Sequence, residues 1–271
     1  MSDRSSPIAG RWREVRQERR AALIPFLPAG FPTPAESLEA IRTVGTGGAD
    51  ILEIGVPFSD PLADGPTIQR ATQTALAHGM TLPRVLDLVR RAAVPVPVVL
   101  MTYLNPVLAY GLDRLLPDAT AAGVAGILVT DLPAGTAPEI EAPLLASALD
   151  LIRLVAPTTP ERRLADALRG AGGFVYLISR LGVTGARPDA PPLPDLTAHV
   201  ARIRRVSDLP VAVGFGLSTP AQAAGAARVA DGVVVGSALV DAMERGGISA
   251  AARLTAALAT AVRGARRSDA A

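Results

Sequence analysis

One acidic residue stands inside a run of otherwise apolar residues. Glu53 lies in the segment 51–56, which reads ILEIGV and predicts a buried strand. Burial disfavours the charged form of a carboxyl group and raises its pKa, so that the group can donate and accept protons near neutral pH. A structural ion pair with a buried arginine would suit the same position. The residues around Glu53 leave both readings open.

The loop after this strand contains two more acids. Residues 57–66 read PFSDPLADGP, with Asp60 and Asp64 between prolines that restrict the backbone. Such a stiff loop holds its carboxylates in place, as a catalytic loop requires. For Asp60 we favour a tight turn in which the side chain bonds its own backbone. For Asp64 the loop alone allows either role.

Glycines follow the last two predicted strands, at 214–220 (GFGLSTP) and 235–238 (VGSA). Each group leads into a predicted helix, where backbone N–H groups can bind a phosphate and glycine permits close approach. The loop 180–194 has two glycines around Thr184, a composition that suits a mobile lid. The pattern predicts a phosphate-binding rim, with ordinary turn glycines as the alternative.

The elements that would position these residues alternate regularly along the chain. Apolar runs typical of strands buried on both faces are separated by helix-like segments, several of which start with a hydroxyl N-cap and a proline at Thr33, Thr81, Thr159 and Thr219. This alternation predicts an α/β protein, a single-domain (β/α)8 TIM barrel over residues 1–271, with a doubly wound open sheet as the alternative. The eight predicted strands are 22–28, 50–56, 97–103, 125–131, 151–156, 173–179, 210–214 and 231–236.

The two ends of the chain are expected to lie outside the barrel proper. Residues 1–18 form an N-terminal extension or helix that Trp12 anchors, and residues 264–271 form a flexible tail. The loops 57–66 and 180–194 would both lie at the C-terminal mouth of the barrel, where active sites of this fold are built.

Composition excludes several kinds of chemistry. The 271 residues include no cysteine, and all 27 basic residues are arginine, so neither a thiolate nor a lysine Schiff base can operate. His78 and His199 fall in or beside predicted helices and are read as surface residues, so no metal site is predicted. The arginine-rich ends leave the body of the chain acidic, which argues against nucleic-acid binding. We see neither a secretory signal nor a membrane-spanning run, and expect a cytoplasmic enzyme.

Taken together, these motifs resemble the tryptophan synthase alpha chain family. The segment 52–66 matches the family signature, and the match continues with Tyr103 before Asn105-Pro106, with the segments 131–133 and 176–180, and with the glycine motifs. The resemblance covers about residues 20 to 260. It implies cleavage of indole-3-glycerol phosphate to indole and glyceraldehyde 3-phosphate, in which Glu53 is the proton donor and acceptor and Asp64 accepts the indole N–H.

The resemblance also implies binding residues and partners. Phe26, Leu128, Tyr176 and Val234 would line the indole pocket, Tyr103 and Thr184 would lie beside the carboxylates, and Gly185, Gly216, Gly236 and Ser237 would bind phosphate. An α₂β₂ assembly with a beta chain that carries pyridoxal phosphate is implied, with no cofactor in this chain. Phe31 and Leu181 depart from the family pattern at the mouth. Another phosphate-binding barrel lyase or isomerase, or a subunit that mainly activates its partner, is the alternative function.

Overall fold

The strands form one parallel sheet in the computed structural model, which describes residues 6–178, 196–214 and 216–265. The strands occur where the apolar runs predict them. They are β1 (Ala22–Pro28), β2 (Leu52–Gly55), β3 (Val98–Thr102), β4 (Val124–Val129), β5 (Asp150–Leu151), β6 (Arg153–Val155), β7 (Val175–Ile178), β8 (Val211–Gly214) and β9 (Gly232–Val235).

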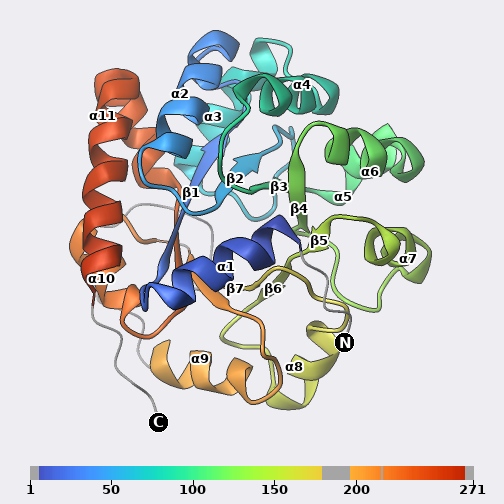
Figure 1. Ribbon diagram of the computed structural model, residues 1–271. Helices are drawn as coiled ribbons and strands as arrows, with labels where there is room; N and C mark the ends of the chain where they lie inside the picture. The colour runs from blue at the N-terminus through green and yellow to red at the C-terminus, as the bar shows by residue number, and fades with distance from the viewer. Residues whose placement is uncertain (1–5, 179–195, 215, 266–271) are drawn as a thin grey trace.

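The sheet curls into a barrel because its two ends belong to one continuous segment. The strand order is β5-β4-β3-β2-β1-β9-β8-β7-β6, and only Ile152 separates β5 from β6 in the chain. The first half of this segment pairs with β4 and the second half with β7. The predicted fifth strand is therefore broken in two where it changes neighbours. The (β/α)8 barrel is confirmed, with all neighbouring strands parallel (Figure 1).

Helices surround the barrel, as the alternating pattern predicts (Figure 1). Those in the described part of the chain are α1 (Pro7–Gln17), α2 (Pro34–Thr46), α3 (Pro66–Ala77), α4 (Leu82–Ala92), α5 (Leu104–Tyr110), α6 (Leu112–Ala121), α7 (Pro138–Ala146), α8 (Glu161–Ala167), α9 (Leu196–Arg204), α10 (Pro220–Ala227) and α11 (Ser237–Gly264). Gly246 and Gly247 depart from helical geometry and divide α11 into two stretches.

Each of the four predicted hydroxyl residues lies at or next to a helix N-cap. Thr33, Thr81 and Thr219 are the N-caps of α2, α4 and α10. Before α8, Thr159 lies next to the N-cap as predicted, but Pro160, predicted as the first helical residue, is itself the N-cap. The Thr159 hydroxyl instead accepts a hydrogen bond from the backbone N–H of Ala156 at 3.3 Å.

Helix α1 crosses the open N-terminal end of the barrel (Figure 1). Its buried face consists of Ile8, Trp12 and Val15, and the Trp12 ring lies 6.0 Å from that of Phe174. A side chain on Gly232, at the start of β9, would come within 2.8 Å of Trp12. The helix expected within residues 1–18 thus closes the base of the barrel and leaves the opposite end for the site.

The C-terminal end of the chain differs from its prediction. Helix α11 continues to Gly264, the first residue of the predicted flexible tail, and Ala265 is buried at 7% exposure because it packs in a cluster with Val262. Residues 266–271 lie outside the described residues. No helix in the described part of the chain is long and apolar enough to cross a membrane.

Candidate active site

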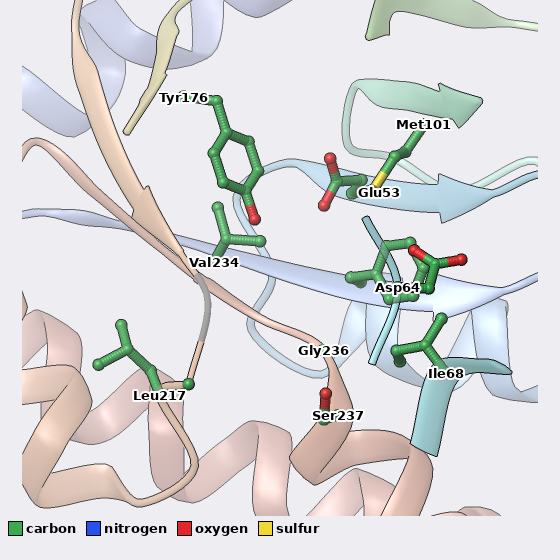
Figure 2. Close-up of a pocket in the computed structure, with 11 residues that line it drawn as sticks. Glu53, Asp64, Ile68, Met101, Tyr176, Leu217, Val234, Gly236 and Ser237 are labelled. Carbon is green, nitrogen blue, oxygen red and sulfur yellow. The ribbon is translucent and has the colours of Figure 1, made fainter. Parts of the chain in front are cut away.

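A pocket opens at the C-terminal ends of the strands (Figure 2). Its empty space is about 460 Å³, counting the part open to solvent. It is mostly apolar with two carboxylates and a rim of glycine and serine. The residues that line it are Phe26, Glu53, Asp64, Ile68, Met101, Tyr176, Gly216, Leu217, Val234, Gly236 and Ser237.

Glu53 lies in β2 and points into this pocket (Figure 2). Its residue is 1% exposed, and neither carboxylate oxygen has a hydrogen-bond partner in the described part of the chain. Burial, together with the nearby charge of Asp64, raises the pKa of Glu53 from 4.5 to about 8. Glu53 is therefore protonated near neutral pH, and its O–H is available to a ligand.

Asp64 reaches the same pocket from the loop between β2 and α3. Burial raises its pKa to about 6, and a hydrogen bond with Tyr103 opposes this rise. The Tyr103 hydroxyl also accepts a hydrogen bond from the backbone N–H of Ala63 at 3.1 Å, so it fixes the loop as well as its carboxylate. Near neutral pH one carboxyl is charged and the other is protonated, which is the division that acid and base roles need.

Two aromatic side chains form the pocket walls, and glycines make room for them. A side chain on Gly55 would come within 2.5 Å of the Phe26 ring, and one on Gly214 within 2.2 Å of the Tyr176 hydroxyl. Both rings therefore fit only because the neighbouring strands end in glycine. Both rings line the pocket, where they could pack against an aromatic ligand.

The glycine rim lies on the side of the pocket where β8 and β9 end (Figure 2). Gly236 is the N-cap of α11 and Ser237 its first residue, so the unpaired N–H groups of that helix start at the rim. Gly216 has φ +82°, a conformation that favours glycine. This arrangement suits an anionic group next to the aromatic rings.

The other predicted residues divide into three groups. Thr184, Gly185, Leu181 and the predicted lid lie outside the described residues. Asp60 is exposed and accepts a hydrogen bond from the Ser59 hydroxyl, away from the pocket lining. Leu128 is fully buried and pairs in register with the lining residue Met101, so its contact with a ligand stays a prediction.

The sequence reasoning missed three lining residues. They are Ile68, Met101 and Leu217. The sequence held a signal for two of them. Met101 is two residues before Tyr103 in the predicted strand 97–103, and residues two apart in a strand share a face. Leu217 directly follows Gly216, which was predicted at the site. Ile68 lies in the first turn of α3, and its place in the pocket depends on how the preceding loop folds.

Comparisons with known proteins agree with this geometry. The family model of the tryptophan synthase alpha chain matches residues 12–267. The chain belongs to the tryptophan synthase alpha chain family. It is 50% identical over 242 residues to the tryptophan synthase alpha chain of Geobacter sulfurreducens, covering 89% of this chain and 91% of that one. It is 47% identical over 275 residues to that of Acidiphilium cryptum, covering 97% and 99%.

Solved structures give the same result. The chain superposes on tryptophan synthase of Mycobacterium tuberculosis with a TM-score of 0.87 and 43% identity, covering 95% of this chain and 98% of that one. For tryptophan synthase subunit alpha of Legionella pneumophila the TM-score is 0.85 and the identity 34%, covering 95% and 98%. As a member of this family, the chain is an alpha subunit in tryptophan biosynthesis and a lyase that acts on indole-3-glycerol phosphate.

Proposed function

We propose that Glu53 and Asp64 carry out the retro-aldol cleavage of indole-3-glycerol phosphate, from opposite positions around the indole ring. The observation that carries this assignment is the Glu53 carboxyl, which has no hydrogen-bond partner among the described residues and is buried in the pocket that Asp64 also lines. A buried glutamate with a structural role would be expected to have an arginine or a hydrogen-bond donor beside it.

In the first step the Glu53 carboxylic acid gives its proton to C3 of the indole ring. The ring then carries a positive charge centred on its nitrogen, and the Asp64 carboxylate stabilises this charge by accepting the N–H hydrogen bond. A Glu53 pKa of about 8 and an Asp64 pKa of about 6 supply these two protonation states together near pH 7.

In the second step the Glu53 carboxylate takes the proton of the hydroxyl on the carbon attached to the ring. The O–H electron pair becomes the C=O bond of glyceraldehyde 3-phosphate, and the electrons of the breaking C–C bond return to the ring as indole. Glu53 regains the proton it gave, so the cycle closes without net change in the enzyme. The protonated indole is the electron sink, which in other aldolases an iminium from lysine supplies.

The remaining pocket residues would orient the substrate. Phe26, Tyr176 and Val234 would contact the indole ring, and the backbone N–H groups of Gly216, Gly236 and Ser237 would bind the phosphate. We expect Gly185 to complete the phosphate site, Thr184 to lie beside the carboxylates and Leu128 to complete the indole pocket, as the family resemblance implies.

We further propose a tryptophan synthase beta chain as the partner, in an α₂β₂ assembly through which indole passes between sites. Leu62 and Leu108, which follow neighbouring strands at the mouth, are 78% and 50% exposed, as expected of side chains that a partner covers. Pyridoxal phosphate would belong to the beta chain, because this chain has no lysine with which to hold it.

An assay of the purified chain tests the proposal. Indole-3-glycerol phosphate is added with and without a beta chain, and indole and glyceraldehyde 3-phosphate are measured separately. Formation of the two products in equal amounts by the isolated chain supports the proposal. Products that appear only as tryptophan, and only when a catalytically competent partner is present, would favour a partner-activating subunit instead.

A further inference from the structure

The glycine loop after β8 is held by one side chain that lies outside the pocket. The Gln222 side-chain oxygen accepts hydrogen bonds from the backbone N–H of Ser218 at 2.9 Å and of Thr219 at 3.3 Å, and from the Ser218 hydroxyl at 3.1 Å. In return the Thr219 hydroxyl accepts a hydrogen bond from the Gln222 backbone N–H at 3.2 Å. Gln222 and Thr219 thus form a capping box at the start of α10.

The position of these bonds relative to the pocket is what gives them a functional meaning. Gly216 and Leu217 line the pocket, and Ser218 and Thr219 are the next two residues of the chain. Gly216 on the other side, with φ +82°, allows the backbone wide freedom, so a loop without its cap would sample many conformations. Gln222 fixes the loop immediately after its last pocket-lining residue.

The same bonds also determine which N–H groups a ligand can use. The N–H groups of Ser218 and Thr219 are occupied by Gln222, so the donors left for an anion on this side precede Ser218. An anion site whose donors are already oriented binds more tightly, because less conformational entropy is lost when the ligand arrives.

We propose that Gln222 is a positioning residue for the phosphate of the substrate, and that it acts by holding the loop that contains Gly216 and Leu217 in its binding conformation. This inference rests on the proposed phosphate site. Gln222 does not touch the reacting atoms, so its effect falls on phosphate binding and not on bond cleavage.

The test compares a ligand with a phosphate and one without. Affinities for indole-propanol phosphate and for indole are measured by calorimetry for the wild type and for Gln222→Ala. We expect the Kd of indole-propanol phosphate to rise about tenfold, as for loss of about 1.4 kcal/mol, while the Kd of indole changes less than about twofold. In turnover, KM for indole-3-glycerol phosphate rises by a similar factor and kcat falls less than about threefold.

Two further variants separate the hydrogen bonds from charge. In Gln222→Glu a carboxylate oxygen can accept the same hydrogen bonds, but a negative charge is added near the site. Ala221→Glu adds a charge at the exposed neighbouring position and leaves Gln222 in place. We expect Gln222→Glu to bind indole-propanol phosphate like Ala221→Glu and better than Gln222→Ala. If Gln222→Ala does not fold, Gln222→Asn takes its place, because its amide is one methylene shorter.

The outcomes distinguish this inference from the proposed function. If the wild type binds indole-propanol phosphate no better than indole, the phosphate site and the role of Gln222 are both wrong. If the wild type prefers the phosphate ligand and Gln222→Ala retains that preference, only the role of Gln222 is wrong. Equal losses of affinity for both ligands would show a general structural role and would also overturn the inference.

Discussion

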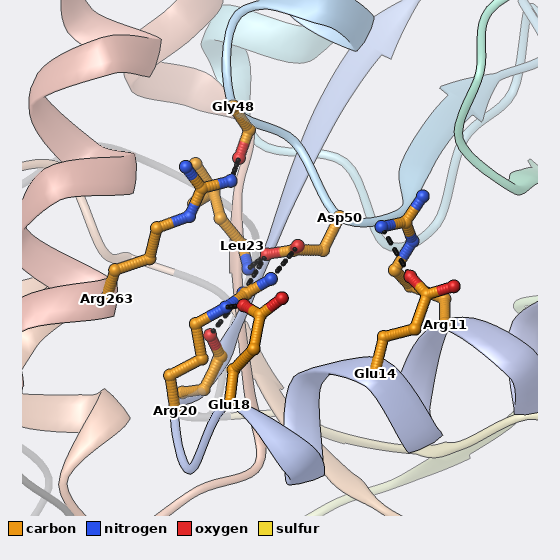
Figure 3. Close-up of polar contacts among 9 residues, drawn as sticks. Arg11, Glu14, Glu18, Arg20, Leu23, Gly48, Asp50 and Arg263 are labelled. Atoms are coloured by element: carbon orange, nitrogen blue, oxygen red, sulfur yellow. Dashed lines mark hydrogen bonds and ion pairs between the residues drawn. The ribbon is translucent and has the colours of Figure 1, made fainter.

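Asp50, just before β2, and Glu53, within it, lie three residues apart, yet they have opposite surroundings. Asp50 is at the base of the barrel, where its two oxygens each accept a hydrogen bond from Arg20 at 2.7 Å and one also accepts from the backbone N–H of Leu23 (Figure 3). Glu53 is about 10 Å further along toward the mouth, buried equally at 1% exposure, and has no described hydrogen-bond partner.

The comparison distinguishes a buried acid that stabilises the fold through an ion pair from a buried acid whose carboxyl group is available to a ligand. At the base the charge of Asp50 is balanced by Arg20, and Asp50 joins the connection between α1 and β1 to the segment that leads into β2. At the mouth no hydrogen-bond partner in residues 6–178, 196–214 and 216–265 offsets the cost of burying Glu53, and this cost appears as a raised pKa. Such an arrangement persists in a folded protein when function requires it.

The largest expected effect is on turnover in Glu53→Gln. Because glutamine is nearly isosteric but cannot transfer the proton, we expect kcat for indole release to fall by about 10⁴-fold, at the upper end for loss of an acid–base group. Calorimetry with indole-propanol phosphate should show a Kd close to that of the wild type. Turnover like that of the wild type would remove Glu53 from the mechanism.

Asp50→Ala should produce the complementary result. Removing Asp50 breaks the buried ion pair of Arg20, which keeps its pair with the exposed Glu18, and we expect the free energy of unfolding in urea to fall by about 3–5 kcal/mol. In the fraction that stays folded, kcat should match the wild type. Loss of kcat without loss of stability would contradict the division between base and mouth.

Asp64→Asn should reduce kcat by on the order of 10²-fold, less than the change at Glu53. The asparagine can still accept the indole N–H but does not supply the charge that stabilises the protonated ring. Steady-state assays of indole release measure this, with thermal melting as a control for folding. A full-rate Asp64→Asn enzyme would leave Asp64 with a structural role in its loop.

The smallest expected effect is the pH dependence of stability. In the folded protein the pKa of Glu53 is raised from 4.5 to about 8, so the folded state holds this proton more tightly than the unfolded chain does. This stabilisation is fully present below pH 4.5 and is lost as the pH rises to 8. Relative to Glu53→Gln, the wild type should therefore lose at least about 1 kcal/mol of unfolding free energy over that interval.

Urea unfolding of both proteins at pH 4.5 and at pH 8.5 measures this difference. The contrary result is a difference in unfolding free energy between the wild type and Glu53→Gln that does not change with pH, or that changes in the opposite direction. Either result would mean that the Glu53 carboxyl is not held in its neutral form. The same experiment on the pair Asp50→Asn and wild type gives a matched reference at the base of the barrel.

Much of this contrast could be predicted, because burial follows from local pattern. Glu53 lies among apolar residues, so its burial and its shifted pKa were foreseeable from residues 51–56. Whether an arginine would form an ion pair with Glu53 was not foreseeable, because Arg20 is remote in sequence. In the structure Arg20 pairs with Asp50. Buried Glu141 is an example of the structural ion pair that was the alternative for Glu53. It pairs with Arg153, and its pKa is lowered.

Features that depend on packing between remote elements were harder to foresee. The position of Ile68 in the pocket follows from the path of the loop before α3, and the break at Ile152 follows from a change of strand partner. The hydrogen bonds of Gln222 belong to a capping box, for which glutamine three residues after Thr219 was a readable signal. That these hydrogen bonds lie beside the pocket could be seen only from the three-dimensional structure.

The most direct test of the central claim is a crystal structure of the Glu53→Gln variant with indole-3-glycerol phosphate bound. We predict the residue 53 side chain beside C3 of the indole ring, an Asp64 oxygen within hydrogen-bond distance of the ring nitrogen, and the phosphate against the backbone N–H groups of Gly216, Gly236 and Ser237. Substrate bound with its ring away from both side chains, or with its phosphate elsewhere, would contradict the account.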